Sequence, residues 1–145
     1  LRDRMFFSAM DKFLPDSPKI FVSETGIRNP DMDSSYSLTK RLLTDHPEVT
    51  AVICLNDLMA YGVIQAATYF NKSVPDELSV IGMDDIYISR NFNPTVTSIG
   101  FDKREYGMMA FELLYNHIKK KIVKDIDIRT ELYIRSSTGL APGLK

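Results

Sequence analysis

The stretch from Asp57 to Asp85 decides the fold of this chain. It begins with a helical pattern, Asp57-Leu58-Met59-Ala60-Tyr61-Gly62-Val63-Ile64-Gln65-Ala66-Ala67, and ends with Val74-Pro75-Asp76-Glu77-Leu78-Ser79-Val80-Ile81-Gly82-Met83-Asp84-Asp85. A second apolar run, Ala51-Val52-Ile53-Cys54-Leu55, precedes it and leads into Asn56. Two short apolar runs around one helix predict a βαβ unit with parallel strands and a right-handed crossover. The polar pairs Asn56/Asp57 and Asp84/Asp85 then share the carboxyl edge of the sheet, where open α/β sheets bind ligands.

Composition narrows the classes of protein that the chain can represent. It has 145 residues, 44% of them hydrophobic, which fits one soluble globular unit. A net charge of −1, from 18 basic and 19 acidic residues, gives no electrostatic reason for this chain to grip a nucleic-acid backbone. No apolar run approaches the roughly 20 residues that a membrane helix needs, and the charged opening Leu1-Arg2-Asp3-Arg4 does not resemble a signal peptide.

The single cysteine and the first residue add two expectations. Cys54 lies inside a predicted strand, so we expect a buried, unreactive thiol. One cysteine cannot form an internal disulfide, and this favours a reducing cytoplasm. The chain opens with Leu1 in the middle of a helical pattern, so we expect it to be part of a longer protein.

Further elements are predicted on both sides of the βαβ unit. Apolar spacing predicts helices at about 2–13, from Ser34 or Ser35 to His46, and at 102–120. It also predicts strands at 19–23, at 95–99 and within 126–134. Turn residues predict a loop at 24–33. Asn56 can cap the helix that starts at Asp57, so the alternative interpretation of this pair is a helix start with no ligand role. Lys119-Lys120-Lys121 is interpreted as a solvated helix end.

The polar residues favour binding over catalysis. The sequence contains no recognisable nucleophile motif, metal-spaced His/Cys cluster or glycine-rich phosphate loop. Asp84 and Asp85 could act as an acid and a base, but carboxylates also accept hydrogen bonds from ligand hydroxyls. Asn56 can donate and accept, and Arg2 is either a planar donor or an exposed terminal side chain. Such a set suits a sugar, whose hydroxyls both donate and accept.

Four motifs resemble one protein family. They are Thr50-Ala51-Val52-Ile53-Cys54-Leu55-Asn56-Asp57-Leu58-Met59-Ala60-Tyr61-Gly62, Val74-Pro75-Asp76-Glu77-Leu78-Ser79-Val80-Ile81-Gly82-Met83-Asp84-Asp85, Pro94-Thr95-Val96-Thr97-Ser98-Ile99 and Arg135-Ser136-Ser137-Thr138-Gly139. The chain resembles the effector-binding domain of LacI/GalR-type bacterial transcription repressors, which has the type I periplasmic-binding-protein fold. The family pattern Arg-x-x-Gly-Phe-x-x-Ala also fits Arg2, Phe6 and Ala9, with Met5 where glycine is usual.

The resemblance implies a set of site residues. The family's effector contacts correspond to Arg2, Asn56 and Asp84, with Phe101 beside the cleft, where it either stacks on a sugar ring or packs at the hinge. Positions that face the partner subunit in the family correspond to Tyr61, Gln65 and Phe92. Asp57 is expected to hold the helix start. The resemblance implies no catalytic residue, no metal and no cofactor.

The resemblance also implies a domain organisation and a function. We expect an open parallel α/β sheet with helices on both faces, in which residues 1–99 form most of the second subdomain without its first strand. Residues 100–145 would form the crossover, a helix at 102–120 that belongs to the other subdomain, and a returning strand. The implied protein is a cytoplasmic homodimeric regulator that binds a sugar-like effector and reaches operator DNA only through a helix-turn-helix domain outside this chain. The alternatives are a sugar-binding protein of a transport system and an enzyme that uses Asp84 and Asp85.

Overall fold

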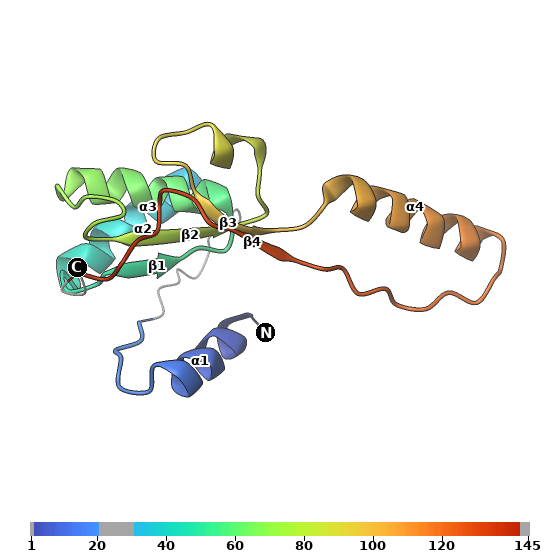
Figure 1. The fold of residues 1–145 in the computed structure, drawn as a ribbon, viewed down its shortest axis with the longest axis horizontal. Helices are drawn as coiled ribbons and strands as arrows, with labels where there is room; N and C mark the ends of the chain where they lie inside the picture. Colours follow the sequence, from blue (N-terminus) through green and yellow to red (C-terminus); the bar gives the residue numbers. More distant parts are fainter. Residues whose placement is uncertain (1, 21–30, 143–145) are drawn as a thin grey trace.

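The computed structural model describes residues 2–20 and 31–142, with side chains from Arg4 onward within those ranges. In chain order the elements are α1 (Arg2–Phe13), α2 (Met32–Asp45), β1 (Ala51–Ile53), α3 (Asp57–Tyr69), β2 (Ser79–Met83), the 3-10 helix η1 (Tyr87–Arg90), β3 (Thr97–Gly100), α4 (Lys103–Ile118) and β4 (Glu131–Tyr133). Figure 1 shows the sheet at the centre and α4 projecting far to one side of it.

The sheet has the spatial order β1-β2-β3-β4. β1 and β2 are parallel, with Ile53 opposite Ile81, and β2 and β3 are also parallel. β4 runs antiparallel to β3, so the sheet is mixed. The βαβ unit predicted from the sequence is therefore confirmed, and the carboxyl ends of three parallel strands lie along one edge.

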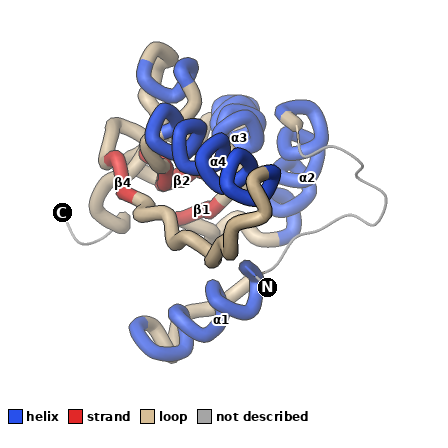
Figure 2. The backbone as a smooth tube through the Cα atoms, turned by 90° about the vertical axis from the view of Figure 1, so that its right-hand side faces the viewer, coloured by secondary structure: helices blue, strands red, loops and turns tan. Residues whose placement is uncertain are grey.

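One face of the sheet is covered by α3, and α2 packs on α3. Six of the nine buried residues of the central apolar cluster lie in α3 or in the strands, and the cluster comprises Cys54, Ala60, Tyr61, Val63, Ile64, Ala67, Leu78, Val80 and Val96. The two helices approach closely at Gly62, where an added Cβ would lie 2.2 Å from the carbonyl oxygen of Met32. α1 lies on the opposite side of the sheet (Figures 1 and 2).

α4 extends away from this core and is not covered by it. None of its residues is buried. The chain then returns alongside α4 without regular secondary structure until β4. Large apolar side chains on the projection are exposed, among them Phe111 at 70% and Ile122 at 95%. The helix predicted at 102–120 is therefore present as α4, and its assignment to the other subdomain stays a prediction.

Several predicted boundaries were wrong. The cap of α2 is Asp31, whose side chain accepts from the Ser34 N–H at 2.9 Å, and Ser34 is the N3 residue of a capping box. In the predicted strand at 19–23, residues 19–20 are not in a strand, and 21–23 lie outside the described residues, as does most of the predicted loop at 24–33. The last strand covers only Glu131–Tyr133, because only these residues find a partner in β3.

Candidate functional site

Asn56 caps α3 and remains half-buried at the carboxyl end of β1. Its Oδ1 accepts from the Met59 N–H at 2.8 Å, so the predicted helix cap is confirmed. The capping bond uses the oxygen of the side-chain amide, and a ligand role would use its nitrogen as a donor. A capping role and a ligand role are therefore compatible at this residue.

Asp57, the next residue, is fully buried, and its carboxylate accepts hydrogen bonds from other elements of the fold. Its Oδ2 accepts from the Ser89 hydroxyl at 2.5 Å and from the Ile86 N–H at 2.9 Å, and its Oδ1 accepts from the Ser98 hydroxyl at 2.6 Å. These contacts join the start of α3 to η1 and β3. The sequence predicted that Asp57 holds the start of its own helix, but its hydrogen bonds also connect that helix to η1 and β3.

Asp84 and Asp85 form a turn at the carboxyl end of β2. Both have left-handed backbone conformations, with φ of 92° and 44°. Asp84 is exposed, whereas Asp85 is buried. Thus, in both polar pairs the first residue stays accessible and the second is buried. Asn56 and Asp84 follow neighbouring parallel strands and lie at the same edge of the sheet.

Asp85 is held by ion pairs with Arg90 and Arg135. Burial alone would raise the pKa of the Asp85 carboxyl, but the hydrogen bonds and positive charges of the two arginines outweigh it and lower the pKa below 3.8. A carboxylate ionised and paired in this way is not free to act as a general acid. This arrangement argues against the enzymatic alternative that uses Asp84 and Asp85.

The lowered pKa of Asp85 gives a prediction for acid stability. A depressed folded-state pKa contributes stability above the unfolded value of 3.8 and loses it as the pH falls through the folded pKa. We expect the urea midpoint of the wild type to fall below about pH 4, and to fall less steeply in Asp85→Asn. Asp127→Asn, at an exposed site, makes the same change in net charge and should retain the wild-type slope. Equal slopes for Asp85→Asn and the wild type would contradict the ion-pair assignment.

Phe101 lies at the crossover between β3 and α4. Its ring is half-buried and contacts Tyr106, with 5.2 Å between the ring centroids. A hollow of about 300 Å³ at this place is lined by Arg90, Phe101, Asp102, Lys103, Arg104 and Tyr133. Neither Asn56 nor Asp84 lines this hollow, but Lys103 connects it to the Asp84–Asp85 turn through hydrogen bonds to both carbonyl oxygens.

The three predicted dimer residues have different environments. Tyr61 is buried; its hydroxyl donates to the Ile88 carbonyl at 3.0 Å, and its ring lies 4.7 Å from that of Phe92. Phe92 is 54% exposed, and Gln65 on α3 is also exposed. Tyr87, at 80%, extends the exposed apolar surface beside Phe92. Tyr61 therefore supports this surface from beneath.

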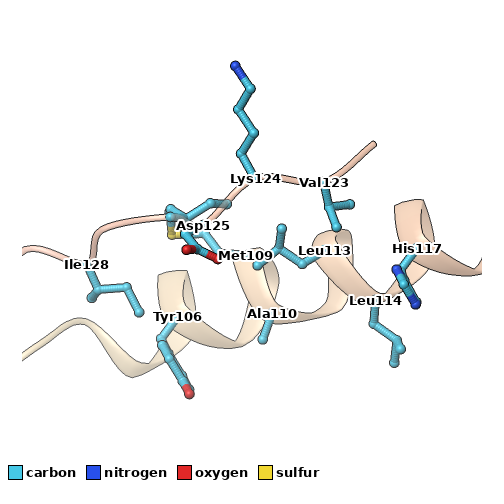
Figure 3. A pocket seen from close by; sticks show the side chains of 11 residues that line it. Tyr106, Met109, Ala110, Leu113, Leu114, His117, Val123, Lys124, Asp125 and Ile128 are labelled. Carbon is cyan, nitrogen blue, oxygen red and sulfur yellow. The ribbon is translucent and has the colours of Figure 1, made fainter. Parts of the chain in front are cut away.

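A larger hollow of about 640 Å³ lies far from the sheet, between α4 and the returning chain. Figure 3 shows Leu113 of α4 and Val123 of the returning segment among the mainly apolar side chains that line it. Its ionisable members are Tyr106, His117, Lys124 and Asp125, and none of them belongs to the predicted site. Its apolar lining is typical of a surface that packs against protein.

Four further predictions concern Arg2, Cys54, metal binding and membrane-spanning helices. Arg2 begins α1, but its side chain lies outside the described residues, so its predicted ligand contact is not tested. Burial, with a smaller effect of the Asp57 charge, raises the pKa of the Cys54 thiol to about 12, and an inert thiol is the result. Among the described residues no His, Cys, Asp or Glu cluster could hold a metal ion. No described helix has the length and apolar character of a membrane span.

Sequence reasoning missed two residues at this edge of the sheet. Arg135 belongs to one of the four family motifs, which gives it no role, and in the structure it pairs with Asp85, 50 positions away. Lys103 was counted only as part of a helix. No local sequence pattern indicates either role, because the partners, Asp85 for Arg135 and the Asp84–Asp85 turn for Lys103, lie far away in sequence.

Comparisons with known proteins agree with the fold and the motifs. Residues 2–138 match the periplasmic binding protein-like domain. The HTH-type transcriptional repressor PurR of Mannheimia succiniciproducens is 42% identical over 107 residues, which are 72% of this chain and 32% of that protein. The chain thus spans about a third of the length of the curated relatives that it matches. These relatives are repressors and not enzymes.

Solved structures give the same result. A LacI family transcriptional regulator from Arthrobacter sp. FB24 in complex with lactose has a TM-score of 0.82 and 27% identity, over 96% of this chain and 52% of that one. A LacI family regulator from Enterococcus faecium with bound ribose has a TM-score of 0.81 and 28% identity, over 97% and 51%. The chain belongs to the periplasmic binding protein-like domain family, in the form found in the effector-binding domains of LacI/GalR-type transcriptional regulators.

Proposed function

We propose that this chain senses a small sugar-like effector for a cytoplasmic transcriptional regulator. The observation that carries the proposal is the position of Asn56 and Asp84 at the same edge of the sheet. They follow adjacent parallel strands, and both remain accessible while Asp57 and Asp85 are buried behind them. An amide and a carboxylate at such an edge can accept from and donate to sugar hydroxyls. The lactose and ribose in the two related structures support this class of ligand.

Arg2 and Phe101 complete the proposed site. Phe101 is half-buried at the crossover, where its ring can cover an apolar sugar face. Residues 1–99 would supply one wall of the cleft, and the other subdomain of the regulator would supply the second. The exposed apolar side of α4, in residues 100–145, would then pack against that other subdomain.

In the proposed mechanism the effector changes the affinity of the regulator for operator DNA. A ligand can shift an equilibrium between two conformations only by its difference in affinity for them. If the other subdomain closes over a sugar held by Asn56 and Asp84, the closed form binds the sugar more tightly. Operator affinity changes because the helix-turn-helix domains of the dimer move with the subdomains.

A gel-shift titration tests this function. The full-length regulator, with an operator fragment identified by selection, is titrated with ribose, lactose and their phosphates. We expect one of these ligands to change operator affinity by about 5- to 150-fold, the usual range of allosteric coupling. The 145-residue chain alone should give no shift. Operator affinity that no member of the panel alters, or a shift by the 145-residue chain, would contradict the proposal.

A transport-type sugar-binding protein is the second candidate, because it would share the fold. The relatives named above are transcriptional regulators, and they favour the first candidate. The same titration separates the two functions, since a transport protein would bind the sugar and no operator.

The proposal includes a homodimer that forms through the exposed face around η1. We call this the η1 surface and define it as Gln65, Tyr87, Ile88 and Phe92, supported by Tyr61. Exposed apolar patches of this kind often mark protein interfaces. Phe92→Glu in the full-length protein would place a charge in that interface. We expect light scattering after size exclusion to show at least about a tenfold weaker dimer, given the usual size of interface hot spots.

Tyr69→Glu is the matched control for the dimer. Tyr69 is an aromatic residue on α3 that is 61% exposed, and the centre of its ring lies 4.0 Å from the Lys40 ammonium, so a glutamate there has a partner. It should leave the dimer intact. A dimer that survives Phe92→Glu at low protein concentration would rule out the η1 surface.

A further inference from the structure

The Asp84–Asp85 turn has an unusual backbone for its sequence. Two consecutive non-glycine residues have positive φ, which costs free energy and persists only where neighbouring groups fix the conformation. The conformation has a consequence for the side chains: Asp84 is left in solvent, while Asp85 is buried among arginines. Whatever fixes this turn therefore fixes the direction in which the Asp84 carboxylate is presented.

One neighbouring strand, β3, fixes the amide groups of the turn. The Asp84 N–H donates to the Ile99 carbonyl at 2.8 Å, and the Asp85 N–H donates to the Ser98 hydroxyl at 3.0 Å. Both partners lie in β3. The amide side of the turn is therefore held by the sheet itself.

The carbonyl groups of the turn are held differently. The Lys103 ammonium donates to the Asp85 carbonyl at 2.9 Å and also to the Asp84 carbonyl. One cation thus holds two consecutive carbonyl groups of the strained turn. Charged donors form stronger hydrogen bonds than neutral ones.

Lys103 comes from a different part of the fold. It is the first residue of α4, directly after the crossover, and its ammonium also lies 5.6 Å from the centre of the Phe101 ring. The remainder of α4 projects away from the sheet (Figure 1). Lys103 therefore ties the start of this projecting helix to the turn that carries Asp84.

We propose that Lys103 is a positioning residue for effector binding: it holds the Asp84–Asp85 turn so that Asp84 faces the ligand, and it couples that turn to α4. The inference rests on the proposed function in one respect, the role of Asp84 at the effector site. The coupling acts both ways. A movement of α4 relative to the sheet changes the hydrogen bonds of Lys103 to the two carbonyl groups. A ligand held by Asp84 favours the position of α4 in which Lys103 makes these hydrogen bonds.

Hydrogen exchange of the full-length regulator tests the positioning without a ligand. Lys103→Met retains the apolar part of the side chain and removes the ammonium. We expect exchange of the Asp84 and Asp85 amides to become about tenfold faster, because the loss of charged hydrogen bonds eases local opening. Lys103→Arg, which can still donate to both carbonyls, should restore slow exchange. Arg104→Met removes the neighbouring cation of the same hollow and should leave both amides unchanged. Unchanged exchange in Lys103→Met would overturn the proposal.

Titration with ribose and lactose supplies the second readout. For the sugar that the wild type binds, Lys103→Met should raise Kd about tenfold, Lys103→Arg should raise it less, and the melting temperature should change little because Lys103 is exposed. A wild-type Kd in Lys103→Met would overturn the role in binding. If the wild type binds neither sugar, the proposed ligand class fails, and the exchange experiment still decides whether Lys103 holds the turn.

Discussion

Asp57→Ala is expected to destabilise the protein by about 3–5 kcal/mol, because it leaves three hydrogen-bond donors unsatisfied at a cost of about 1–3 kcal/mol each. The substitution removes a fully buried carboxylate that accepts three hydrogen bonds. It leaves the hydroxyls of Ser89 and Ser98 and the Ile86 N–H without their acceptor. Because these donors lie in η1, β3 and the loop before η1, the loss separates elements that the sheet alone does not join. Urea-induced unfolding followed by circular dichroism measures the change.

Asp84→Ala is the matched control for this prediction. It removes the same functional group one strand away, but from an exposed position, so we expect a change in unfolding free energy of less than about 1 kcal/mol. Asp57→Asn should lie between the two, because an amide oxygen can still accept. Equal stabilities for Asp57→Ala and Asp84→Ala would show that the buried network does not hold these elements together.

Gly62→Ala is expected to cost about 3 kcal/mol or more, at the upper end of what overpacking usually costs. The added Cβ would lie 2.0 Å from the Ser35 Oγ and 2.2 Å from the Met32 carbonyl oxygen. Ser35 could rotate away, but the carbonyl belongs to the backbone of α2. The two helices would therefore have to separate, and the separation would loosen the apolar cluster around Tyr61 and Val63. The same urea titration measures the loss.

Gly107→Ala is the control that separates crowding from helix propensity. Gly107 also lies inside a helix, but nothing lies within 4 Å of an added Cβ. Alanine should stabilise α4 by about 0.5–1 kcal/mol, because glycine loses more conformational entropy in a helix. A Gly62→Ala variant as stable as the wild type would contradict the close packing of α2 against α3 at this glycine.

The fold around β1, α3 and β2 could be predicted because its signals are local. Alternation of apolar runs with a helical pattern identifies a parallel unit, and Asn56 before Asp57 identifies the helix start. Local signals also mislead. Ser34 or Ser35 was predicted as a helix cap, yet Asp31 takes that position and Ser34 completes the capping box from inside the helix. Both residue types can cap, and local sequence alone does not rank them.

The supports of the candidate site could not be predicted, because their partners are distant in sequence. Asp57 was expected to serve its own helix, but its acceptor oxygens are used by residues 29, 32 and 41 positions away. Asp85 pairs with Arg135, which is 50 positions away. These contacts depend on the order of strands in the sheet, and no periodicity in the sequence contains that information. The accessible residues Asn56 and Asp84, by contrast, follow from the strand ends alone.

Isothermal titration of ribose and lactose into the full-length regulator is the most direct test of the effector site. The wild type should bind one of them, whereas Asp84→Ala and Asn56→Ser should each weaken binding by at least about tenfold, the cost of losing one hydrogen bond to a charged or polar group. Serine at position 56 can still cap α3, so its effect reports on the ligand and not on the helix. Wild-type affinity in both variants would contradict a site built on the neighbouring ends of β1 and β2.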